Sequence, residues 1–349
     1  MPSGAGRRRR GCGGRTDEEP CPVSPARPPG EYPVNREILS DVLRCWNLEP
    51  RAELPEVPLA GSPERSLFRT VVEDSTGRRL VLDRLHPSVL ARKREIASSL
   101  DYLARQGLAG VHPYLRAADG DFIVKAAGGF WQISPFVDGA ELIRPGYTRE
   151  AWRGEALARF LVDLEAASRG IPFGRPGRPF SVAGFIREFV ARIARHDPEW
   201  AEAVGPAYRC LEAGFFAVHD RLPAGFCHGD PHALNVIWGD RDIRGVIDWE
   251  FSGHKPQGYD AALVVGCIGM EDPSSLAGPF VQSFLDGLRA SRCLDAGSLA
   301  VLPEFVLALR FAWLSDWLRK KDWDMVEMET DYIRLLLDGR DRLRRAWAL

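Results

Sequence analysis

The chain has 349 residues, of which 45% are hydrophobic and 27% are charged. This composition supports a folded core and excludes a wholly disordered chain, and the length favours about two domains or lobes. The 48 acidic and 46 basic residues give a formal net charge of -2, which argues against nucleic acid as the main partner. The longest apolar run, near Ala261–Met270, is too short to span a bilayer, so no membrane partner is expected.

The cysteines also bound the possibilities. There are seven of them, an odd number, and none forms a C-x-x-C pair. Neither a disulfide framework nor a zinc site is indicated, and we expect a reducing, cytoplasmic location. Residues 1–30 are rich in Gly, Pro and Arg without apolar periodicity, which predicts a disordered tail.

Residues 31–137 read as a sheet-rich N-terminal lobe. A short helix at Asp41–Trp46 precedes two strands that a turn joins into a hairpin. A helix follows, with Ser88 as its N-cap and Gly107 as its stop, and two further strands end the lobe. The predicted elements are strands at 67–72 and 79–85, a helix at 89–106, and strands at 122–125 and 130–135.

Residues 138–349 read as a mainly helical lobe with a small inserted β segment. Helices are predicted at 149–168, 182–195, 198–219, 258–270, 275–290, 298–319 and 323–345. The inserted β segment covers 224–228, 236–238 and 243–249. This order predicts an α+β, two-lobe fold with its hinge near 137–139.

The β segment carries the chemistry-bearing residues. Its sequence Phe226-Cys-His-Gly-Asp-Pro-His-Ala-Leu-Asn235 is followed by Ile247-Asp-Trp-Glu250. Asp230, Asn235 and Asp248 therefore stand on loops beside short apolar strands, where rigid elements hold functional groups. Phosphoryl transfer needs a carboxylate beside the attacking hydroxyl and oxygen ligands for Mg²⁺. Protein kinases place these groups in H-R-D-x-x-x-x-N and a later Asp, with the same four-residue gap.

The pattern resembles the aminoglycoside phosphotransferase and choline kinase family of small-molecule kinases. The family carries H-G-D-x-x-x-x-N, then I-D-[WFY]-[ED], then a further Asp, and Gly258-Tyr259-Asp260 supplies the last of these. The resemblance implies a bilobal, protein-kinase-like α+β fold with the nucleotide between the lobes. It also implies ATP with Mg²⁺, GTP not being distinguished, and a small-molecule hydroxyl as acceptor.

The resemblance also implies roles for single residues. Asp230 would be the catalytic base, and Asn235 and Asp248 would hold Mg²⁺. His228 would shape the loop through a hydrogen bond, and Asp260 would brace the loop or cap the helix that starts there.

The N-terminal lobe departs from the family pattern. The position where the family places a phosphate-binding base on the second hairpin strand reads Asp83 here. Arg84 is adjacent, but side chains alternate along a strand, so it faces the other way unless a bulge intervenes. Glu95 matches the family's helix Glu, and we predict Arg84 as its partner beside the nucleotide. The nucleotide base is expected near Ser134 and Val137.

The acceptor is less defined. Trp313 and Trp317 precede an acidic run that begins at Asp322, which suits a cationic acceptor such as an amino sugar or a quaternary ammonium. A core role for the indoles and a solvated acidic face explain the same pattern. A neutral sugar or an amino alcohol such as homoserine would also fit. His232 and Glu250 are further candidates for acceptor contact, although Glu250 could equally support the metal or stay exposed.

Two alternative functions stay open from the sequence. Asp83 favours a catalytically weak, pseudokinase-like binding module, because a carboxylate there repels phosphate. A protein kinase is disfavoured, because H-G-D replaces H-R-D and no Ala-Pro-Glu follows Asp248.

Overall fold

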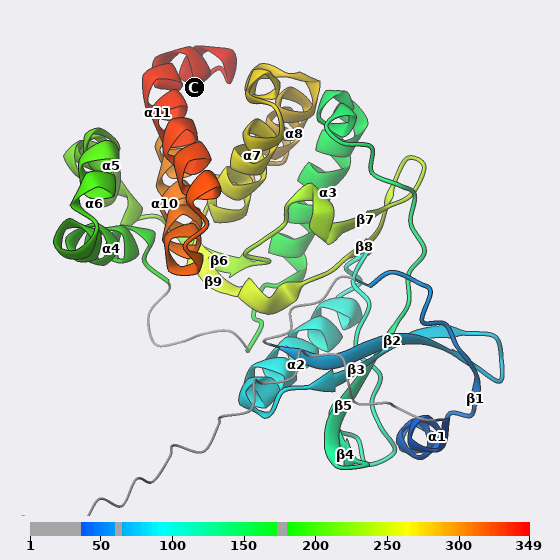
Figure 1. The fold of residues 1–349 in the computed structure, drawn as a ribbon. Helices are drawn as coiled ribbons and strands as arrows, with labels where there is room; N and C mark the ends of the chain where they lie inside the picture. The colour runs from blue at the N-terminus through cyan, green and yellow to red at the C-terminus, as the bar shows by residue number, and fades with distance from the viewer. Residues whose placement is uncertain (1–35, 60–64, 173–179) are drawn as a thin grey trace, which may run out of the picture.

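The computed structural model describes residues 36–59, 65–172 and 180–349, so the predicted tail at 1–30 lies outside the described residues. Two lobes are visible, a sheet with its helices and a larger helical body, as Figure 1 shows. This is the α+β arrangement that the element order predicts.

The N-terminal lobe is built on a five-stranded antiparallel sheet in the order β1-β2-β3-β5-β4. Alternation along β3 divides its side chains between two faces. Leu80 and Leu82 pack with Trp131 and helix α1, whereas Leu85 packs with Ala97 of helix α2 on the other face. The elements are α1 (Arg36–Arg44), β1 (Pro50–Glu53), β2 (Ser66–Asp74), β3 (Arg79–Leu85), α2 (Leu90–Arg105), β4 (Val124–Ala126) and β5 (Gly129–Pro135).

The C-terminal lobe is a helical body with one large apolar core. Helix α3 packs along α8, and α10 packs against α7 and α11, as Figure 1 shows. The helices are α3 (Ala151–Ala167), α4 (Val182–His196), α5 (Pro198–Cys210), α6 (Phe216–His219), α7 (Tyr259–Glu271), α8 (Pro279–Ser291), α9 (Ala296–Ala300), α10 (Leu302–Lys320) and α11 (Trp323–Ala346).

Two short β ladders lie on the side of this lobe that faces the N-terminal lobe (Figure 1). One pairs β6 (Ala224–Cys227) with β9 (Gly253–Pro256), and the other pairs β7 (Val236–Trp238) with β8 (Ile243–Val246). Both ladders are antiparallel. Their connecting loops carry the residues that the sequence singled out.

Several element predictions differ from the structure. The helix expected at 298–319 is two helices, α9 and α10, because Pro303 lies in the first turn of α10, a position that suits proline. β1 and β9 were not predicted, since their sequences, PRAE and GHKP, lack apolar alternation. Both strands form through backbone pairing with a neighbour that is already in place.

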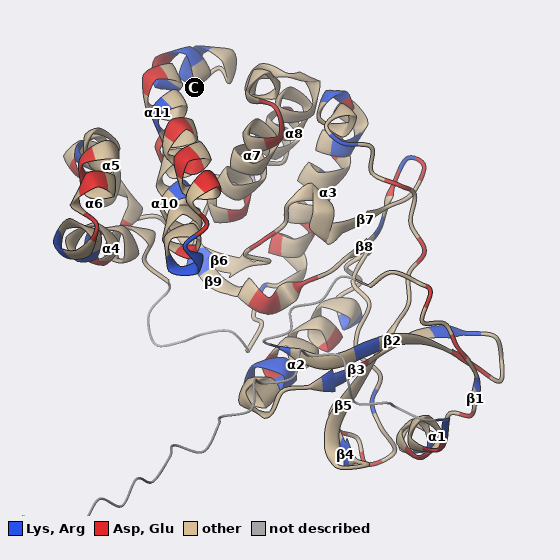
Figure 2. Cartoon of the chain, viewed as in Figure 1, with Lys and Arg blue, Asp and Glu red and all other residues tan. Residues whose placement is uncertain are grey.

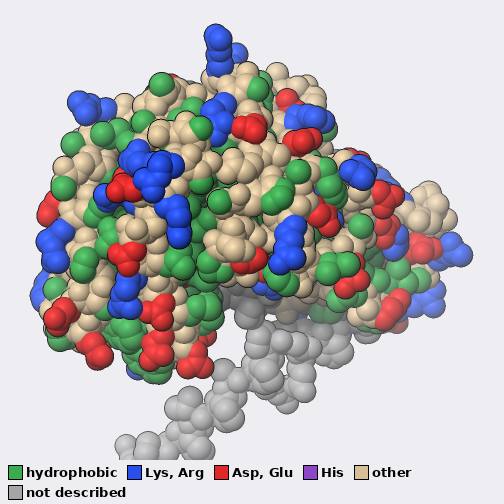
Figure 3. All heavy atoms as spheres, turned by 90° about the horizontal axis from the view of Figure 1, so that it is seen from above, with side chains coloured by type: hydrophobic (Ala, Val, Ile, Leu, Met, Phe, Trp, Pro, Cys, Tyr) green, Lys and Arg blue, Asp and Glu red, His purple; other side chains and the backbone are tan. Residues whose placement is uncertain are grey.

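Charges are distributed over both lobes. Figure 3 shows one face of the molecule, on which acidic and basic side chains are interspersed. Among the described residues, every helix is too short or too polar to cross a lipid bilayer.

Candidate active site

The loop between β6 and β7 is organised around a buried histidine. The Nε2 of His228 donates to the carbonyl of Ile247 at 2.9 Å, and its Nδ1 accepts from the backbone N–H of Asp230 at 3.2 Å. This pattern requires the neutral ring with its proton on Nε2. Burial lowers the pKa of His228 to about 4, which keeps it neutral near pH 7. The contacts are those of a residue that shapes the loop.

Gly229 and Asp260 fix the next turn of this loop. Gly229 has a φ of 88°, and a Cβ there would collide with the carbonyl of Phe251, so only glycine fits. The buried Asp260 carboxylate accepts the backbone N–H of His228 at 2.8 Å and that of Gly229 at 2.9 Å. Burial raises the pKa of Asp260 to about 6, against the two N–H donors, which lower it. Asp260 thus braces the loop from the start of α7.

The two carboxylate oxygens of Asp230 have different surroundings. Its Oδ2 accepts from the Nδ2 of Asn235 at 3.2 Å and lies 3.5 Å from the Nε2 of His232. Its Oδ1 is buried and has no hydrogen-bond partner within the described part of the chain. A buried carboxylate oxygen without a donor is costly, and such atoms are expected where a ligand supplies the donor.

Asp248 follows β8 in a left-handed backbone conformation, with φ 59° and ψ 60°. This conformation is uncommon for a residue with a side chain and clusters at functional sites. The N–H of Ile247 donates to the carbonyl of Asn235 at 2.9 Å, which holds the two loops together. The Asp248 Oδ1 accepts from the Nη1 of Arg65 at 3.0 Å.

The donor set fits a magnesium ion that arrives with a nucleotide. The amide nitrogen of Asn235 donates a hydrogen bond to the Asp230 carbonyl at 2.9 Å. The amide oxygen of Asn235 is therefore the atom that can bind a cation. Carboxylate and amide oxygens are the ligands that Mg²⁺ prefers. No group of three or more His, Cys, Asp or Glu is arranged for a metal among the described residues. Magnesium in phosphoryl-transfer sites uses one or two protein carboxylates plus substrate phosphates, so such a group is not required.

Helix α2 is fastened to the loop after Asp248. The ammonium of the buried Lys93 contacts the Glu250 carboxylate. Arg92 donates to the carbonyl of Glu250 at 2.9 Å and to that of Ser252 at 2.6 Å. The Glu250 side chain thus faces the cations of α2 and Arg65 and does not line the pocket described below, and its contact with the acceptor stays a prediction.

The charged residues of the N-terminal sheet also differ from the expectation. Arg69 on β2 lies opposite Asp83 on β3 and grips both of its oxygens, at 2.5 and 3.0 Å. Arg84 is on the opposite face, where it covers the Trp131 ring and donates to the Gly128 carbonyl at 3.2 Å. Strand alternation thus removes Arg84 from the side of α2, which contradicts the predicted pairing with Glu95.

Glu95 itself accepts from Arg92, one turn earlier on α2, at 2.9 Å. Ser134 lies in β5 beside β3, and Val137 follows the end of that strand. The N–H of Ala140 already donates to Trp238 of the C-terminal lobe, at 2.7 Å, so the chain crosses between the lobes here. The contact of Ser134 and Val137 with a nucleotide base stays a prediction, and so does the lobe boundary between residues 137 and 138.

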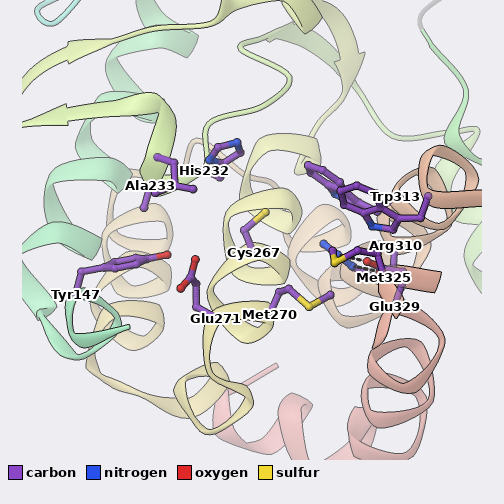
Figure 4. Close-up of a pocket in the computed structure, with 12 residues that line it drawn as sticks. Tyr147, His232, Ala233, Cys267, Met270, Glu271, Arg310, Trp313, Met325 and Glu329 are labelled. Carbon is purple, nitrogen blue, oxygen red and sulfur yellow. Dashed lines mark hydrogen bonds and ion pairs between the residues drawn. The ribbon is translucent and has the colours of Figure 1, made fainter. Parts of the chain in front are cut away.

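A cavity of about 150 Å³ adjoins the loop between β6 and β7. We call this cavity the indole pocket. Figure 4 shows His232 and Ala233 of the loop and Trp313 of α10 around it, and Trp317 of α10 also lines it. The two indoles are stacked with their ring centroids 6.2 Å apart. Glu271 from the end of α7 supplies an acidic group. His232 thus joins the indole pocket to Asp230.

The charges around the indole pocket are mostly compensated. Arg310 and Glu329 are buried and form a two-pronged ion pair, with both N···O distances 2.6 Å (Figure 4). Burial lowers the pKa of Arg310, but the Glu329 carboxylate and other neighbours give it a net rise, whereas burial raises the pKa of Glu329 against the Arg310 charge. Glu271 pairs with Arg144 at 2.5 and 3.1 Å, at the rim.

The acidic run that begins at Asp322 does not act as a unit. Asp322 is the N-cap of α11, where its carboxylate accepts from the N–H of Met325 at 3.4 Å. Glu329, seven residues later, is buried against Arg310. Asp322 caps the helix and does not line the indole pocket, and its contact with the acceptor stays a prediction. Trp317, by contrast, does line the indole pocket.

Several residues of the site were not predicted from the sequence. They reach it from helices and loops that carry no motif, and only Lys93 had a signal, as one of five lysines in the chain. These residues are Arg65, Lys93, Glu271, Arg310 and Glu329.

A sequence profile of the phosphotransferase enzyme family (APH) matches residues 63–294. The chain belongs to this family. It is a small-molecule phosphotransferase that transfers phosphate to an alcohol group.

Related proteins are similar over most of the chain. The homoserine kinase of Mesorhizobium japonicum is 30% identical over 246 residues, covering 67% of this chain and 73% of that protein. The homoserine kinase of Xanthobacter autotrophicus is 29% identical over 234 residues, covering 65% and 70%. Among solved structures, amicoumacin kinase hAmiN in complex with AMP-PNP, Ca²⁺ and Ami has a TM-score of 0.65 at 16% identity, covering 88% of this chain and 94% of that one. The fold is therefore that of the family's kinases.

Proposed function

We propose that this phosphotransferase uses ATP with Mg²⁺ to phosphorylate the hydroxyl of a small amino alcohol, with homoserine as the first candidate. The observation that carries the proposal is the Asp230 carboxylate, whose Oδ1 has no hydrogen-bond partner among the described residues and whose Oδ2 lies 3.5 Å from His232 of the indole pocket. A nucleotide analogue in the related kinase complex supports the same cofactor class.

Asp230 would accept a hydrogen bond from the acceptor hydroxyl and take its proton as the new O–P bond forms. Asn235 and Asp248 would hold Mg²⁺, which neutralises charge on the phosphates. His228 and Asp260 would keep the loop in place, since their partners are backbone groups. The contribution of this chain is therefore mainly positioning and charge placement.

The size of the indole pocket favours a small acceptor over an amino sugar with several rings. Its volume of about 150 Å³ is comparable to a cavity that holds benzene. Homoserine is only slightly larger, and the matched relatives carry that substrate in their names. The stacked indoles would face the ammonium group, and Glu271, which is shared with Arg144, would add negative charge beside them.

The test is a panel of acceptors at fixed MgATP. Homoserine, choline and an aminoglycoside are compared by ADP release, and the product of the best acceptor is examined for a phosphate ester by ³¹P NMR. We expect homoserine to give the highest kcat/KM, with ester formation matching ADP release.

Preference for the aminoglycoside would contradict the size argument while leaving the phosphotransferase assignment intact. Absence of nucleotide binding and of turnover with every acceptor would instead support the pseudokinase-like reading that Asp83 raised. A thermal-unfolding titration with MgATP separates these outcomes, because a ligand that binds only the native state raises the unfolding temperature.

A further inference from the structure

The strand that supplies a phosphate-binding base in this family carries an acid here, so another cation has to meet the nucleotide. Asp83 is buried and committed to Arg69 and to the hydroxyl of Ser66, at 3.1 Å. Lys93 lies nearby and is influenced by Asp83 as well as by Glu250. The cation that meets the nucleotide is therefore expected among the residues that contact Asp248.

Arg65 is the cation that lies on the metal-binding acid. Its Nη1 is 3.0 Å from the Asp248 Oδ1 and 3.8 Å from the Glu250 Oε1. It stands directly before β2, and its own carbonyl accepts the N–H of His86 at 3.0 Å. A residue of the N-terminal lobe thus reaches across to the carboxylate that the family uses for Mg²⁺.

The charges of this region alternate in one chain, which we call the charge chain. From the sheet to the metal acid it contains three cations and three carboxylates, namely Arg69, Asp83, Lys93, Glu250, Arg65 and Asp248. Figure 2 shows basic segments on α2 and the β2–β3 sheet and an acidic segment between β8 and β9. Without a ligand every carboxylate of the charge chain is neutralised by a cation.

We propose that Arg65 is the residue that binds the nucleotide phosphates, and that it is stored on Asp248 until the nucleotide brings its own metal ion. The proposal rests on the proposed function, since it concerns the nucleotide of that reaction. A carboxylate that serves a divalent cation no longer needs the guanidinium, and two cations on one acid repel each other. Released from Asp248, the guanidinium of Arg65 would be able to pair with phosphate oxygens, whose geometry its planar fork matches.

Lys93 is less suited to this role. Its side chain is only 6% exposed and is held by Glu250, whereas that of Arg65 is 30% exposed. Lys93 would have to leave the half-buried Glu250 without its ammonium partner, which is costly. Arg65 moves at the surface of the lobe interface and leaves behind an acid that the metal neutralises.

The test measures two ligands separately. Binding of ATP without metal, in EDTA, is followed by calorimetry, and binding of Mn²⁺ without nucleotide is followed by the loss of its free EPR signal. Wild type is compared with Arg65→Ala, with Asp248→Asn and with Arg51→Ala. Arg51 of the edge strand β1 pairs with Glu73 of β2 at 2.8 Å, and its side chain is 67% exposed. It therefore serves as the matched arginine control.

The proposal predicts opposite signs for the two ligands. Arg65→Ala should weaken metal-free ATP at least about tenfold, because a charge-assisted contact is lost. The same variant should bind Mn²⁺ more tightly, because Asp248 is freed. Asp248→Asn should lose Mn²⁺ and bind metal-free ATP more tightly, because Arg65 is freed. Arg51→Ala should match wild type for both.

Equal affinities of wild type and Arg65→Ala for either ligand would overturn the proposal. Weakening of both ligands by Arg65→Ala would also overturn it, since a structural role has no reason to tighten the metal. A wild-type protein that binds neither metal-free ATP nor MgATP would contradict the proposed function itself, so the two failures are distinguishable.

Discussion

The loop between β6 and β7 and the wall formed by the N-terminal sheet with α2 differ in how closely they follow the family pattern. The loop keeps His228, Asp230 and Asn235 at the family's spacing, and its hydrogen bonds run to backbone groups. The wall carries Asp83 where a base is expected and draws its cations from other elements. Chemistry that depends on the path of the backbone needs fixed spacing. Charge can be supplied by any element within reach.

The largest effect is expected in the catalytic loop. Asp230→Asn keeps the side-chain shape but cannot accept the proton of the acceptor, so the rate should fall about 10²–10⁴-fold. Steady-state kcat with the best acceptor measures this. The unfolding temperature and MgATP affinity of the variant should stay near those of wild type. A variant with full activity would refute the assignment of the base.

The wall should show its effect in stability. Asp83→Asn leaves the Arg69 guanidinium without its carboxylate and should lower the free energy of unfolding by about 3 kcal/mol. Urea unfolding measures this. The matched control is Asp121→Asn, because Asp121 pairs with Arg94 at an exposed site of the same lobe and should cost less than about 1 kcal/mol. Equal losses in the two variants would show that Asp83 is not a structural member of the charge chain.

The smallest effect is a pH dependence of the loop. His228 has a pKa of about 4 in the folded state against an ordinary value near 6.5, so the unfolded chain binds more protons between these values. Its contribution to stability is therefore present above about pH 6.5 and is lost as the pH falls toward 4. The unfolding free energy of wild type minus that of His228→Gln should fall by about 2 kcal/mol from pH 7 to pH 4.

Asp260 acts in the opposite direction in nearly the same range. Its folded-state pKa of about 6 means that the native state holds the extra proton, so its effect lowers stability as the pH rises from 4 to 6. The difference between wild type and His228→Gln cancels this contribution because both proteins contain Asp260. A difference that is flat with pH would contradict the assignment of a buried neutral His228.

The sequence predicted the two-lobe fold and the loop residues because both are local signals. The hairpin strand 79–85 agrees with β3 residue for residue, and the order of Asp230, Asn235 and Asp248 brings them to adjacent loops. The contacts that were missed join distant segments. Arg65 meets Asp248 across 183 positions, and Lys93 meets Glu250 across 157. Such pairs depend on how the lobes meet, which spacing along the chain does not encode.

Asp322 and Arg84 show two other reasons why the sequence alone does not decide what a side chain contacts. An aspartate before a helix can cap it or contact a ligand, and the sequence alone does not decide which. The prediction for Arg84 depended on which face of the strand its side chain lies. The alternation rule placed it on the face away from α2, where it lies over Trp131, whereas the family analogy required the face toward α2.

Gly229 has a consequence for how this protein can change over time. Every residue that a mutation can place there carries a Cβ, and that atom would meet the carbonyl of Phe251. No single substitution at this position therefore preserves the turn, whereas an exposed arginine can be replaced without a steric clash. A lineage that gives up phosphoryl transfer can lose Asp230 and still fold, but it has to keep the glycine for as long as it keeps this turn. Position 229 thus records the ancestry of the fold, and position 230 records its continued use.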